Sequence, residues 1–429
     1  MISLMIILAI VLSIALGYKT KINTGFFAMG FAYIIGCFFL NLKAKQVIAM
    51  WPIKIFFVIF AVSVFYNFPM LNGTLEKLAQ RMLYKVRKFP HLLPIAIFLS
   101  ATFIAGLGAG YFTVLAFFAP ITLILCEKTG MSKLTGALAV NYGSLAGANF
   151  MTSASGIIFK NLIEASGYSN SYYSTTLIFV VSFIIPLVVL SLLILKEKSK
   201  MKHMGALEIE EPEAFDAKQK TTLKLIFSMV SVVLIVPILK NLMPGNELIG
   251  FINSKMNIGL IAIIFSIIAF LMKLGKEKDI ISNVPWKTII MICGVGMLIS
   301  VAIKAGTIEI LSSWVGTNIS KALVPVILAI IGGIMSSFSS TLGVVTPALF
   351  PAIPSIAAAT GLNPATLFVS VVIGAQATAI SPFSSGGSLI LGSEKEENEE
   401  KLFGQLLFRG VPIALIAAVI FSIVISIIL

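Results

Sequence analysis

The sequence predicts an all-α polytopic membrane protein built from two inverted repeats of five transmembrane helices, each repeat with a re-entrant hairpin. Three observations lead to this fold class. Hydrophobic residues make up 58% of the 429 residues and charged residues only 11%, whereas a soluble domain has about 25% charged residues. The two halves of the chain share a pattern of Pro, Gly, Thr and Glu. Each half also contains one long apolar stretch that is interrupted by small and polar residues.

An internal repeat relates the two halves. Residues of several types recur in register, at an offset of 233 residues for the first six pairs and of 231 for the last six, which unrelated hydrophobic segments do not show by chance. The matched positions are Pro52, Lys54, Gly73, Thr74, Glu76, Leu78, Pro120, Gly130, Gly143, Ala146, Ser153 and Gly156 in the first half, and Pro285, Lys287, Gly306, Thr307, Glu309, Leu311, Pro351, Gly361, Gly374, Ala377, Ser384 and Gly387 in the second. Such a repeat in a very apolar chain is typical of secondary transporters, whose site lies where the halves meet.

Five apolar segments of transmembrane length are expected in each half. Residues 1–195 form the first repeat, residues 196–221 a charged linker and residues 222–429 the second repeat. The first segment lacks a basic n-region and a cleavage site, so it is interpreted as a retained span. The expected spans are 2–17, 24–42, 50–68, 131–156 and 172–195, followed by 222–243, 256–274, 286–304, 362–390 and 408–429.

One further apolar stretch lies between the third and fourth spans of each half, at residues 90–126 and 321–359. Small and polar residues interrupt both stretches midway: Gly106, Gly108 and Gly110 in the first, and residues 336–341 with Gly343 in the second. An interruption favours two half-length arms, and hence a re-entrant hairpin buried in protein or lining a water-filled cavity. Two full spans in each stretch are the alternative. Amphipathic segments 72–88 and 306–320 precede the hairpins and are expected to lie in the membrane interface.

Positive charge sets the expected topology. The lysine-rich linker is placed in the cytoplasm, together with Lys19, the basic residues 81–88 and Lys273 to Lys278. Both termini then lie outside the cytoplasm, and the second half is inverted relative to the first. Lys43 and Lys45 are exceptions to this pattern. The predicted location is the cell membrane, meaning the inner or plasma membrane.

Four polar segments at membrane depth, two from each half, mark the candidate site: residues 106–113, 143–156, 336–346 and 374–387. Clusters of Ser and Thr beside helix-breaking Gly and Pro indicate discontinuous helices around a midplane site. Unwound backbone carbonyls there suit a cation, and the N-termini of the restarted helices suit a carboxylate. Packing alone is the alternative explanation for these clusters.

Named candidates follow from these segments. Asn149 could donate to an anion or ligate a cation, whereas its repeat partner Ile380 could not, so the site is expected to be asymmetric. The candidates for substrate binding are Tyr111, Thr113, Asn149, Thr152, Ser153, Ser155, Thr341, Thr346, Ser381, Ser384 and Ser385. The candidates for binding sodium are Gly106, Gly110, Ser144, Ser337, Ser340, Thr341 and Thr378.

The absence of acidic residues from the middle of the expected spans limits the possible coupling ions and substrates. No Asp or Glu falls near the middle of a span, and His91 and His203 lie outside the polar segments. This disfavours coupling to protons and a cationic substrate, and favours sodium or plain exchange. The chain has no Walker sequence and no Ser/His constellation, so it is not expected to be an enzyme. Neither a cofactor nor a further metal is expected, and the net charge of +13 is attributed to topology rather than to nucleic acid.

These residues resemble the ion transporter superfamily: divalent anion/sodium symporters in general, and malonate-carrier-like (MatC-type) dicarboxylate permeases in particular. The resemblance covers essentially the whole chain, and the segment Ala379–Leu391 is most similar to the malonate-carrier branch. The Thr-Pro pair that follows the second broken helix in the family corresponds here to Ser381-Pro382. The Ser-Asn-Thr signature at the hairpin tips of the symporters is replaced here by Gly110-Tyr111-Phe112 and by Thr341-Leu342-Gly343.

The resemblance implies a secondary active transporter of small carboxylates, a dicarboxylate such as malonate or a C4 acid, coupled to sodium. It also implies an elevator mechanism, in which hairpins and broken helices move within the lipid bilayer against the fixed scaffold of a homodimer. Two alternatives stay open. One is an exporter or antiporter of another anion, such as an oxyanion, and the other is a membrane enzyme or assembly subunit that transports nothing.

Overall fold

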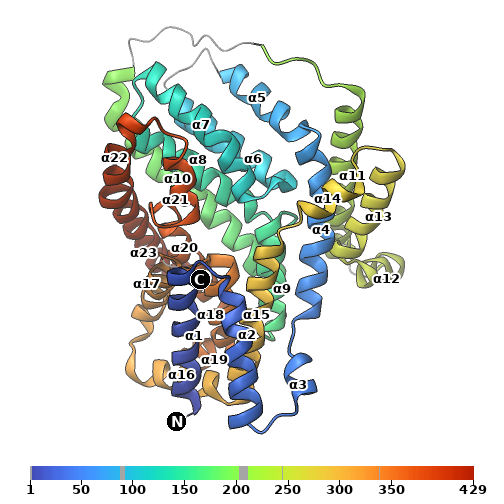
Figure 1. The fold of residues 1–429 in the computed structure, drawn as a ribbon, viewed down its shortest axis with the longest axis vertical. Helices are drawn as coiled ribbons and strands as arrows, with labels where there is room; N and C mark the ends of the chain where they lie inside the picture. The colour runs from blue at the N-terminus through green and yellow to red at the C-terminus, as the bar shows by residue number, and fades with distance from the viewer. Residues whose placement is uncertain (1, 87–91, 202–210, 244, 338) are drawn as a thin grey trace.

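The computed structural model describes residues 2–86, 92–201, 211–243, 245–337 and 339–429, and Figure 1 shows its helices in chain order. Every regular element in these ranges is a helix, and no strand occurs among them. By length and composition, nine helices of the described residues could cross a membrane, or up to eleven if each of two bent pairs is one span. The predicted class of an all-α polytopic membrane protein is confirmed.

The first half follows the predicted spans, and its fourth span is broken into α8 and α9. A short amphipathic helix, α5, leads into the first hairpin, whose arms are α6 and α7. The elements are α1 Ile2–Thr20, α2 Thr24–Ile34, η1 Ile35–Phe39, α3 Ala44–Ile48, α4 Ile53–Leu71, α5 Thr74–Val86, α6 Leu93–Ile104, η3 Ala105–Ala109, α7 Tyr111–Thr129, α8 Lys133–Ala148, α9 Ala154–Ala165 and α10 Ser171–Met201.

The second half repeats this order with two additions. The short helix α12 joins α13 at a bend of 78°, and the acidic helix α22 precedes the last span. Sequence analysis expected neither helix. The elements are α11 Ala217–Leu242, α12 Glu247–Lys255, α13 Ile258–Leu271, α14 Glu277–Ser282, α15 Trp286–Lys304, α16 Thr307–Asn318, η4 Lys321–Leu323, α17 Val324–Ser337, η5 Thr341–Val345, α18 Thr346–Leu349, η6 Phe350–Ala352, α19 Ile353–Thr360, α20 Pro364–Ala377, η7 Thr378–Ile380, α21 Ser385–Leu391, α22 Glu396–Gln405, η8 Leu406–Gly410 and α23 Val411–Ile428.

Matched positions of the sequence repeat adopt matched backbone conformations. A proline with a φ of −76° precedes both α4 and α15. A glycine with positive φ precedes both α5 and α16, and another ends both α7 and α19, where a Cβ would be strained. These pairs are Pro52 and Pro285, Gly73 and Gly306, and Gly130 and Gly361.

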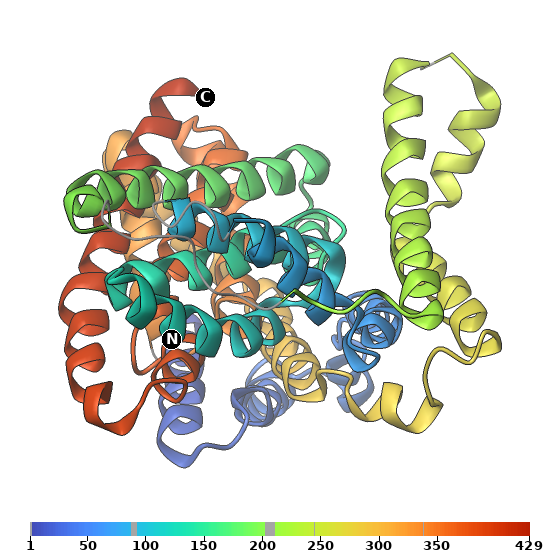
Figure 2. The same cartoon turned by 90° about the horizontal axis from the view of Figure 1, so that it is seen from above.

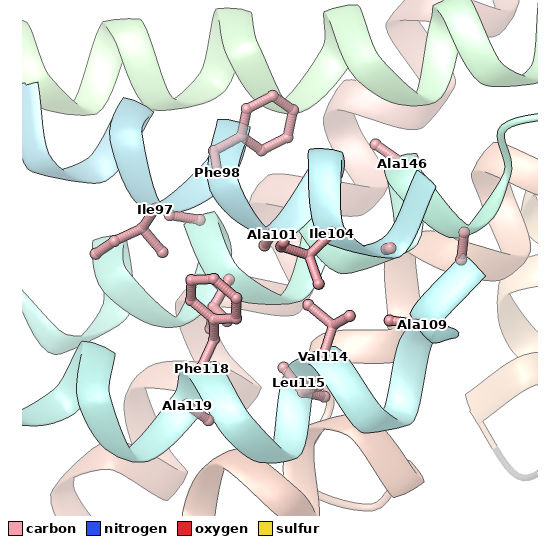
Figure 3. Packing of buried hydrophobic residues seen from close by; sticks show 14 of the residues in the cluster. Ile97, Phe98, Ala101, Ile104, Ala109, Val114, Leu115, Phe118, Ala119 and Ala146 are labelled. Atoms are coloured by element: carbon pink, nitrogen blue, oxygen red, sulfur yellow. The ribbon is translucent and has the colours of Figure 1, made fainter. Parts of the chain in front are cut away.

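Each hairpin packs its first arm closely on the broken helix that follows it, α6 on α8 and α17 on α20. Gly143 of α8 and Gly374 of α20, which are partners in the repeat, allow this approach. A Cβ at either position would collide with a backbone carbonyl of the hairpin arm, that of Phe98 or Ala329. Figure 3 shows apolar side chains of α6, α7 and α8 filling the first of these contacts, among them Phe98, Ile104, Leu115, Phe118 and Ala146.

The linker residues shortly before α11 lie on α5. Arg81 donates to the Glu213 carbonyl at 3.0 Å, and Lys77 donates to the Ala214 carbonyl at 3.2 Å. Residues 202–210 of the predicted linker, with His203, and residues 90–91 of the predicted first hairpin, with His91, lie outside the described residues. Figure 2 shows α11 and α12 standing apart from the rest of the helices. No residue of α12 is buried.

Candidate functional site

The two hairpin tips and the two helix breaks converge on one cavity of about 260 Å³. Helix α4 and the start of α15 complete its wall. Segments that lie in opposite halves of the chain are thereby brought to one place, at which neither half alone would enclose a ligand. The polar side chains lining the cavity are Ser63, Tyr66, Asn67, Tyr111, Thr113, Ser155, Asn283, Thr288, Ser336, Ser339, Ser340, Thr341, Gln376, Ser384 and Ser385.

The first hairpin turns through its backbone. Gly108 and Gly110 have φ values of +100° and +73°, and α7 begins directly afterwards at Tyr111. Gly108 lies so close to the ring of Tyr66 on α4 that a Cβ would collide with it. The Tyr66 hydroxyl donates to the Thr152 carbonyl at 3.1 Å, so the ring joins the hairpin tip to the first helix break.

The first break runs from Asn149 to Ser153 and is closed toward protein. The Ser153 hydroxyl is fully buried and donates to the Ala105 carbonyl of the first hairpin at 2.6 Å. Thr152 is also fully buried, and its hydroxyl has no partner within the described residues. Ser155, in the first turn of α9, is the serine of this region that lines the cavity. The break therefore offers the cavity one hydroxyl.

The second hairpin turns through its side chains. The hydroxyls of Ser336 and Thr341 are 2.9 Å apart and form a hydrogen bond across the tip. Ser340 accepts from the Gly343 N–H at 3.1 Å and so caps the helical turn that follows. Thr346 donates to the Thr341 carbonyl at 3.0 Å. Most hydroxyls of this tip thus satisfy backbone or each other, as clustered Ser and Thr often do.

The second break, between α20 and α21, is held by Ser384. Its hydroxyl donates to the carbonyls of Ala379 and Ser381, at 2.7 and 2.8 Å, and accepts from the Gly387 N–H at 3.1 Å. Ser384 is the residue before α21, and its acceptor role is that of a helix N-cap. Ser385, next along the chain, is exposed to the cavity. The two neighbouring serines therefore have different surroundings.

Tyr111 connects the first hairpin to α8 of the first half and to α21 of the second half. Its hydroxyl donates to Asn141 Oδ1 of α8 at 2.7 Å. The same hydroxyl lies against Gly386 of α21, where a Cβ would collide with it. At the cavity wall, the side-chain amide of Gln376 in α20 forms two hydrogen bonds of 2.9 Å with that of Asn149, the residue after α8. The contact of Tyr111 with Gly386 and the pairing of Asn149 with Gln376 thus join the first half to α21 and α20.

The structure places some predicted residues at the cavity and others behind it. Of the predicted substrate residues, the cavity is lined by Tyr111, Thr113, Ser155, Thr341, Ser384 and Ser385, but not by Asn149, Thr152, Ser153, Thr346 or Ser381. Of the predicted sodium residues, it is lined by Gly110, Ser340 and Thr341, but not by Gly106, Ser144, Ser337 or Thr378. No ligand tests these assignments, and they stay predictions.

Sequence analysis missed several polar residues of the cavity wall, chiefly Tyr66, Asn67, Ser336 and Gln376. Ser336 and Gln376 lie inside two of the four polar segments predicted to form the site, and this position was the signal that could have identified them. Tyr66 and Asn67 lie in the third span, and Asn67 is an amide at membrane depth. Its Nδ2 donates to the Ile280 carbonyl at 2.8 Å. A polar side chain in a span was the available signal.

Among the described residues that line the cavity there is no Asp, Glu, Lys, Arg or His. Within the described residues, no group of three or more His, Cys, Asp or Glu could hold a metal ion. Charge gathers instead at the far end of the first hairpin. There Lys133 pairs with Glu394 at 2.7 Å and with Glu127 at 3.1 Å, and Lys395 pairs with Glu127 at 2.9 Å. The hydrogen bond to Glu127 raises the pKa of Lys395.

The sequence matches one protein family, and the fold is similar to those of solved transporter structures. The family described as "Dicarboxylate carrier protein MatC N-terminus" matches residues 1–148 and 246–379, well over half of the chain. No curated protein matches the sequence. The fold is similar to the crystal structure of the Alcanivorax borkumensis YdaH transporter, with a TM-score of 0.56 and 14% identity over 89% of each chain.

A second similar structure is that of Neisseria gonorrhoeae MtrF, described as illuminating a class of antimetabolite efflux pumps. Its TM-score is 0.55 at 11% identity, with 92% of this chain and 85% of that chain covered. At such identities the two likenesses concern the fold alone. The family match, together with the many apolar helices, supports a multi-pass membrane transporter.

Proposed function

Because this chain belongs to the MatC dicarboxylate carrier family, we propose that it is a secondary active transporter of small dicarboxylates, such as malonate or a C4 acid. One observation carries this proposal. Four interrupted segments, two from each half, converge on a single uncharged cavity lined by hydroxyl and amide groups. That is the architecture expected of a midplane transport site built from discontinuous helices. An enzyme has no need to build its site twice.

The lining suits a carboxylate that arrives with a cation. Hydroxyls of Ser155 and Ser385 donate to carboxylate oxygens, and hydrogen bonds to charged groups are the stronger ones. The described residues that line the cavity include no lysine or arginine that could neutralise a dianion. We therefore propose that sodium supplies the balancing charge and is held by carbonyls and hydroxyls near Gly110, Ser340 and Thr341. With no charged ligand, the sodium site is expected to be weak.

We further propose two inverted repeats with re-entrant hairpins, residues 1–195 and 222–429, joined by a cytoplasmic linker at 196–221. The course of the chain supports this proposal. In Figure 1, α4 rises toward α5 at the top, whereas α15 descends toward α16 at the bottom. The first hairpin lies in the upper part of the molecule, and the second lies in the lower part. Both termini would then be extracytoplasmic in the cell membrane.

An elevator mechanism and a homodimer belong to the same proposal. The hairpins with α8, α9, α20 and α21 would move as one body against the remaining helices. Support for a dimer scaffold comes from α11 and α12, which stand apart in Figure 2 with exposed apolar side chains such as Phe227 and Phe251. Lipid is the other neighbour expected for these surfaces.

Uptake into proteoliposomes tests the function. Purified protein is reconstituted, and entry of radiolabelled malonate and succinate is followed with an inward sodium gradient, with an inward pH gradient, and with neither. Sodium-driven accumulation supports the proposal, whereas uptake that follows the pH gradient and ignores sodium contradicts the coupling. Export or exchange of another anion, the second candidate, is tested by counterflow from liposomes loaded with malonate, sulfate or phosphate. Failure with every anion would contradict transport of this class.

A further inference from the structure

The breaks of the two halves are joined by a pair of amide side chains. Asn149 Nδ2 donates to Gln376 Oε1, and Gln376 Nε2 donates to Asn149 Oδ1, each at 2.9 Å. Asn149 is the residue that ends α8, and Gln376 lies in the last turn of α20. Asn149 Nδ2 also donates to Ser182 Oγ of α10 at 2.9 Å. All three side chains are buried.

Counting hydrogens shows what this pair leaves over. A side-chain amide has two N–H donors and one acceptor oxygen. Asn149 uses both of its hydrogens and its oxygen within the cluster, whereas Gln376 uses one of its two hydrogens. Gln376 is among the residues lining the cavity, and Asn149 is not. The one amide hydrogen that the pair does not use therefore belongs to the residue at the cavity wall.

The reciprocal pair couples the orientations of the two amides. A half-turn of the Gln376 amide alone would set N–H against N–H and oxygen against oxygen, and both hydrogen bonds would be lost. While Asn149 keeps the orientation in which it donates to Ser182, the remaining N–H of Gln376 is therefore held as a donor. In a cavity without charged side chains, one fixed donor matters for a carboxylate, which can only accept.

We propose that Gln376 is a specificity-determining residue that donates to a carboxylate oxygen of the substrate, and that Asn149 is a positioning residue that holds Gln376 in this orientation. The inference rests on the proposed function, because it takes the substrate to be a small carboxylate. It also gives Asn149 a different role from the direct ligand that the sequence suggested. Asn149 acts on the substrate through Gln376.

Binding of malonate to the purified full-length protein in lipid nanodiscs, measured by isothermal titration calorimetry in sodium buffer, tests this. Loss of a hydrogen bond to a charged group weakens binding about ten- to a hundred-fold, which is the effect expected for Gln376→Met. Asn149→Ala should weaken binding by less, and the double variant should bind no more weakly than Gln376→Met, because the two residues act as one unit. Ser370→Ala, which removes a buried hydroxyl within α20, should bind like the wild type.

Two further variants separate positioning from packing. Gln376→Glu keeps an acceptor for Asn149 but has no N–H, so it should lose malonate binding at least as completely as Gln376→Met. Exchange of the two residues, Asn149→Gln with Gln376→Asn, keeps a reciprocal amide pair while drawing the donor back by one methylene. This exchange variant should have the unfolding temperature of the ligand-free wild type, but it should still bind malonate more weakly than the wild type. Recovery of both would show that the pair is only structural, and would overturn the proposal.

Failure of the inference is distinguishable from failure of the function. If the wild type binds malonate and Gln376→Met or Gln376→Glu binds it within about threefold, a change below 1 kcal/mol, then Gln376 does not select the substrate. Additive losses in the double variant lead to the same conclusion. If the wild type binds neither malonate nor succinate, the substrate class is wrong and the inference falls with it.

Discussion

The tip of the first hairpin turns by backbone conformation, whereas the tip of the second turns by side-chain hydrogen bonds. Gly108 and Gly110 take positive φ in the first. In the second, Ser336 bonds to Thr341, and Ser340 caps the turn that follows. Both tips reach the same cavity. The internal repeat thus preserves where each tip lies, while the chemistry that each tip offers has diverged.

This difference tells which change each tip tolerates. A glycine turn leaves backbone groups at the cavity and fails when a Cβ is added. A serine turn tolerates a Cβ but depends on hydroxyls that have no equivalent in the first tip. The two faces of the cavity are therefore chemically unlike, as the pair Asn149 and Ile380 suggested for the two breaks.

Gly108→Ala should be more damaging than a methyl added at either of the other two glycines of the first tip. The left-handed backbone costs a residue with a Cβ about 1–2 kcal/mol, and overpacking a filled site costs about 1–3 kcal/mol more. Here the added methyl would meet the Tyr66 ring, which is itself anchored to the first break. A lower unfolding temperature of the purified protein, with loss of uptake, is the expected result.

Neighbouring glycines of the same tip provide the controls. Gly106 is helical, and a Cβ there would make only ordinary contacts, so Gly106→Ala should be close to wild type. Gly110 has positive φ but open space around it, so Gly110→Ala should show the backbone cost alone. Equal stability of all three variants would mean that the first tip does not depend on its backbone conformation.

Ser384→Ala and Ser385→Ala should separate stability from binding. Removing the Ser384 hydroxyl removes an N-cap, which costs about 0.5–2 kcal/mol, so this variant should unfold at a lower temperature. Ser385 is exposed to the cavity. Ser385→Ala should leave the unfolding temperature unchanged and weaken carboxylate binding about tenfold, by the loss of one charge-assisted hydrogen bond. If Ser384→Ala weakened binding and Ser385→Ala lowered the unfolding temperature, Ser384 would be the ligand and Ser385 the structural residue.

The sequence predicts features that depend on neighbouring residues better than features that depend on residues far along the chain. Glycines and prolines act on their own backbone, so the hairpins and helix breaks were expected close to where they lie. Whether a hydroxyl faces the cavity depends on partners far along the chain. Ser153 bonds to Ala105, and Gln376 pairs with Asn149 from the other half. The sequence alone therefore does not reveal that Ser155 lines the cavity whereas Ser153 does not.

In the second tip, Ser336→Ala should have a moderate effect. The hydrogen bond to Thr341 is lost, at a net cost of about 1 kcal/mol, and the Thr341 side chain is free to turn within the cavity. Weaker substrate binding with little change in unfolding temperature is expected. Ser337→Ala is the matched control, because its hydroxyl bonds to the Gly333 carbonyl of its own helix and does not line the cavity. Equal behaviour of the two variants would contradict a role for the Ser336–Thr341 pair.

The smallest effect is expected for Lys395, the exposed member of the ion cluster that joins the first hairpin to the second half. Among the ion pairs of the described residues, none reaches the second hairpin. Lys395 is exposed, and exposed pairs contribute little and are screened by salt. Lys395→Gln should therefore lower the unfolding temperature slightly in dilute buffer and not at all in high salt. Lys133→Gln should have a larger effect in both, because it leaves the nearly buried Glu394 without its cation.

The pH dependence of this pair has a definite sign. Glu127 raises the pKa of Lys395 and Lys395 lowers that of Glu127, so the contribution of the pair is fully present between the ordinary pKa of a glutamate and that of a lysine. It is lost as the pH rises through the raised value of Lys395, in strongly alkaline solution, or falls through the lowered value of Glu127, in acid. Unfolding temperatures of the wild type and Lys395→Gln should therefore differ by the same small amount throughout the neutral range, and converge at alkaline pH. A difference that disappeared between neutral and mildly acidic pH would point to a different partner for Lys395.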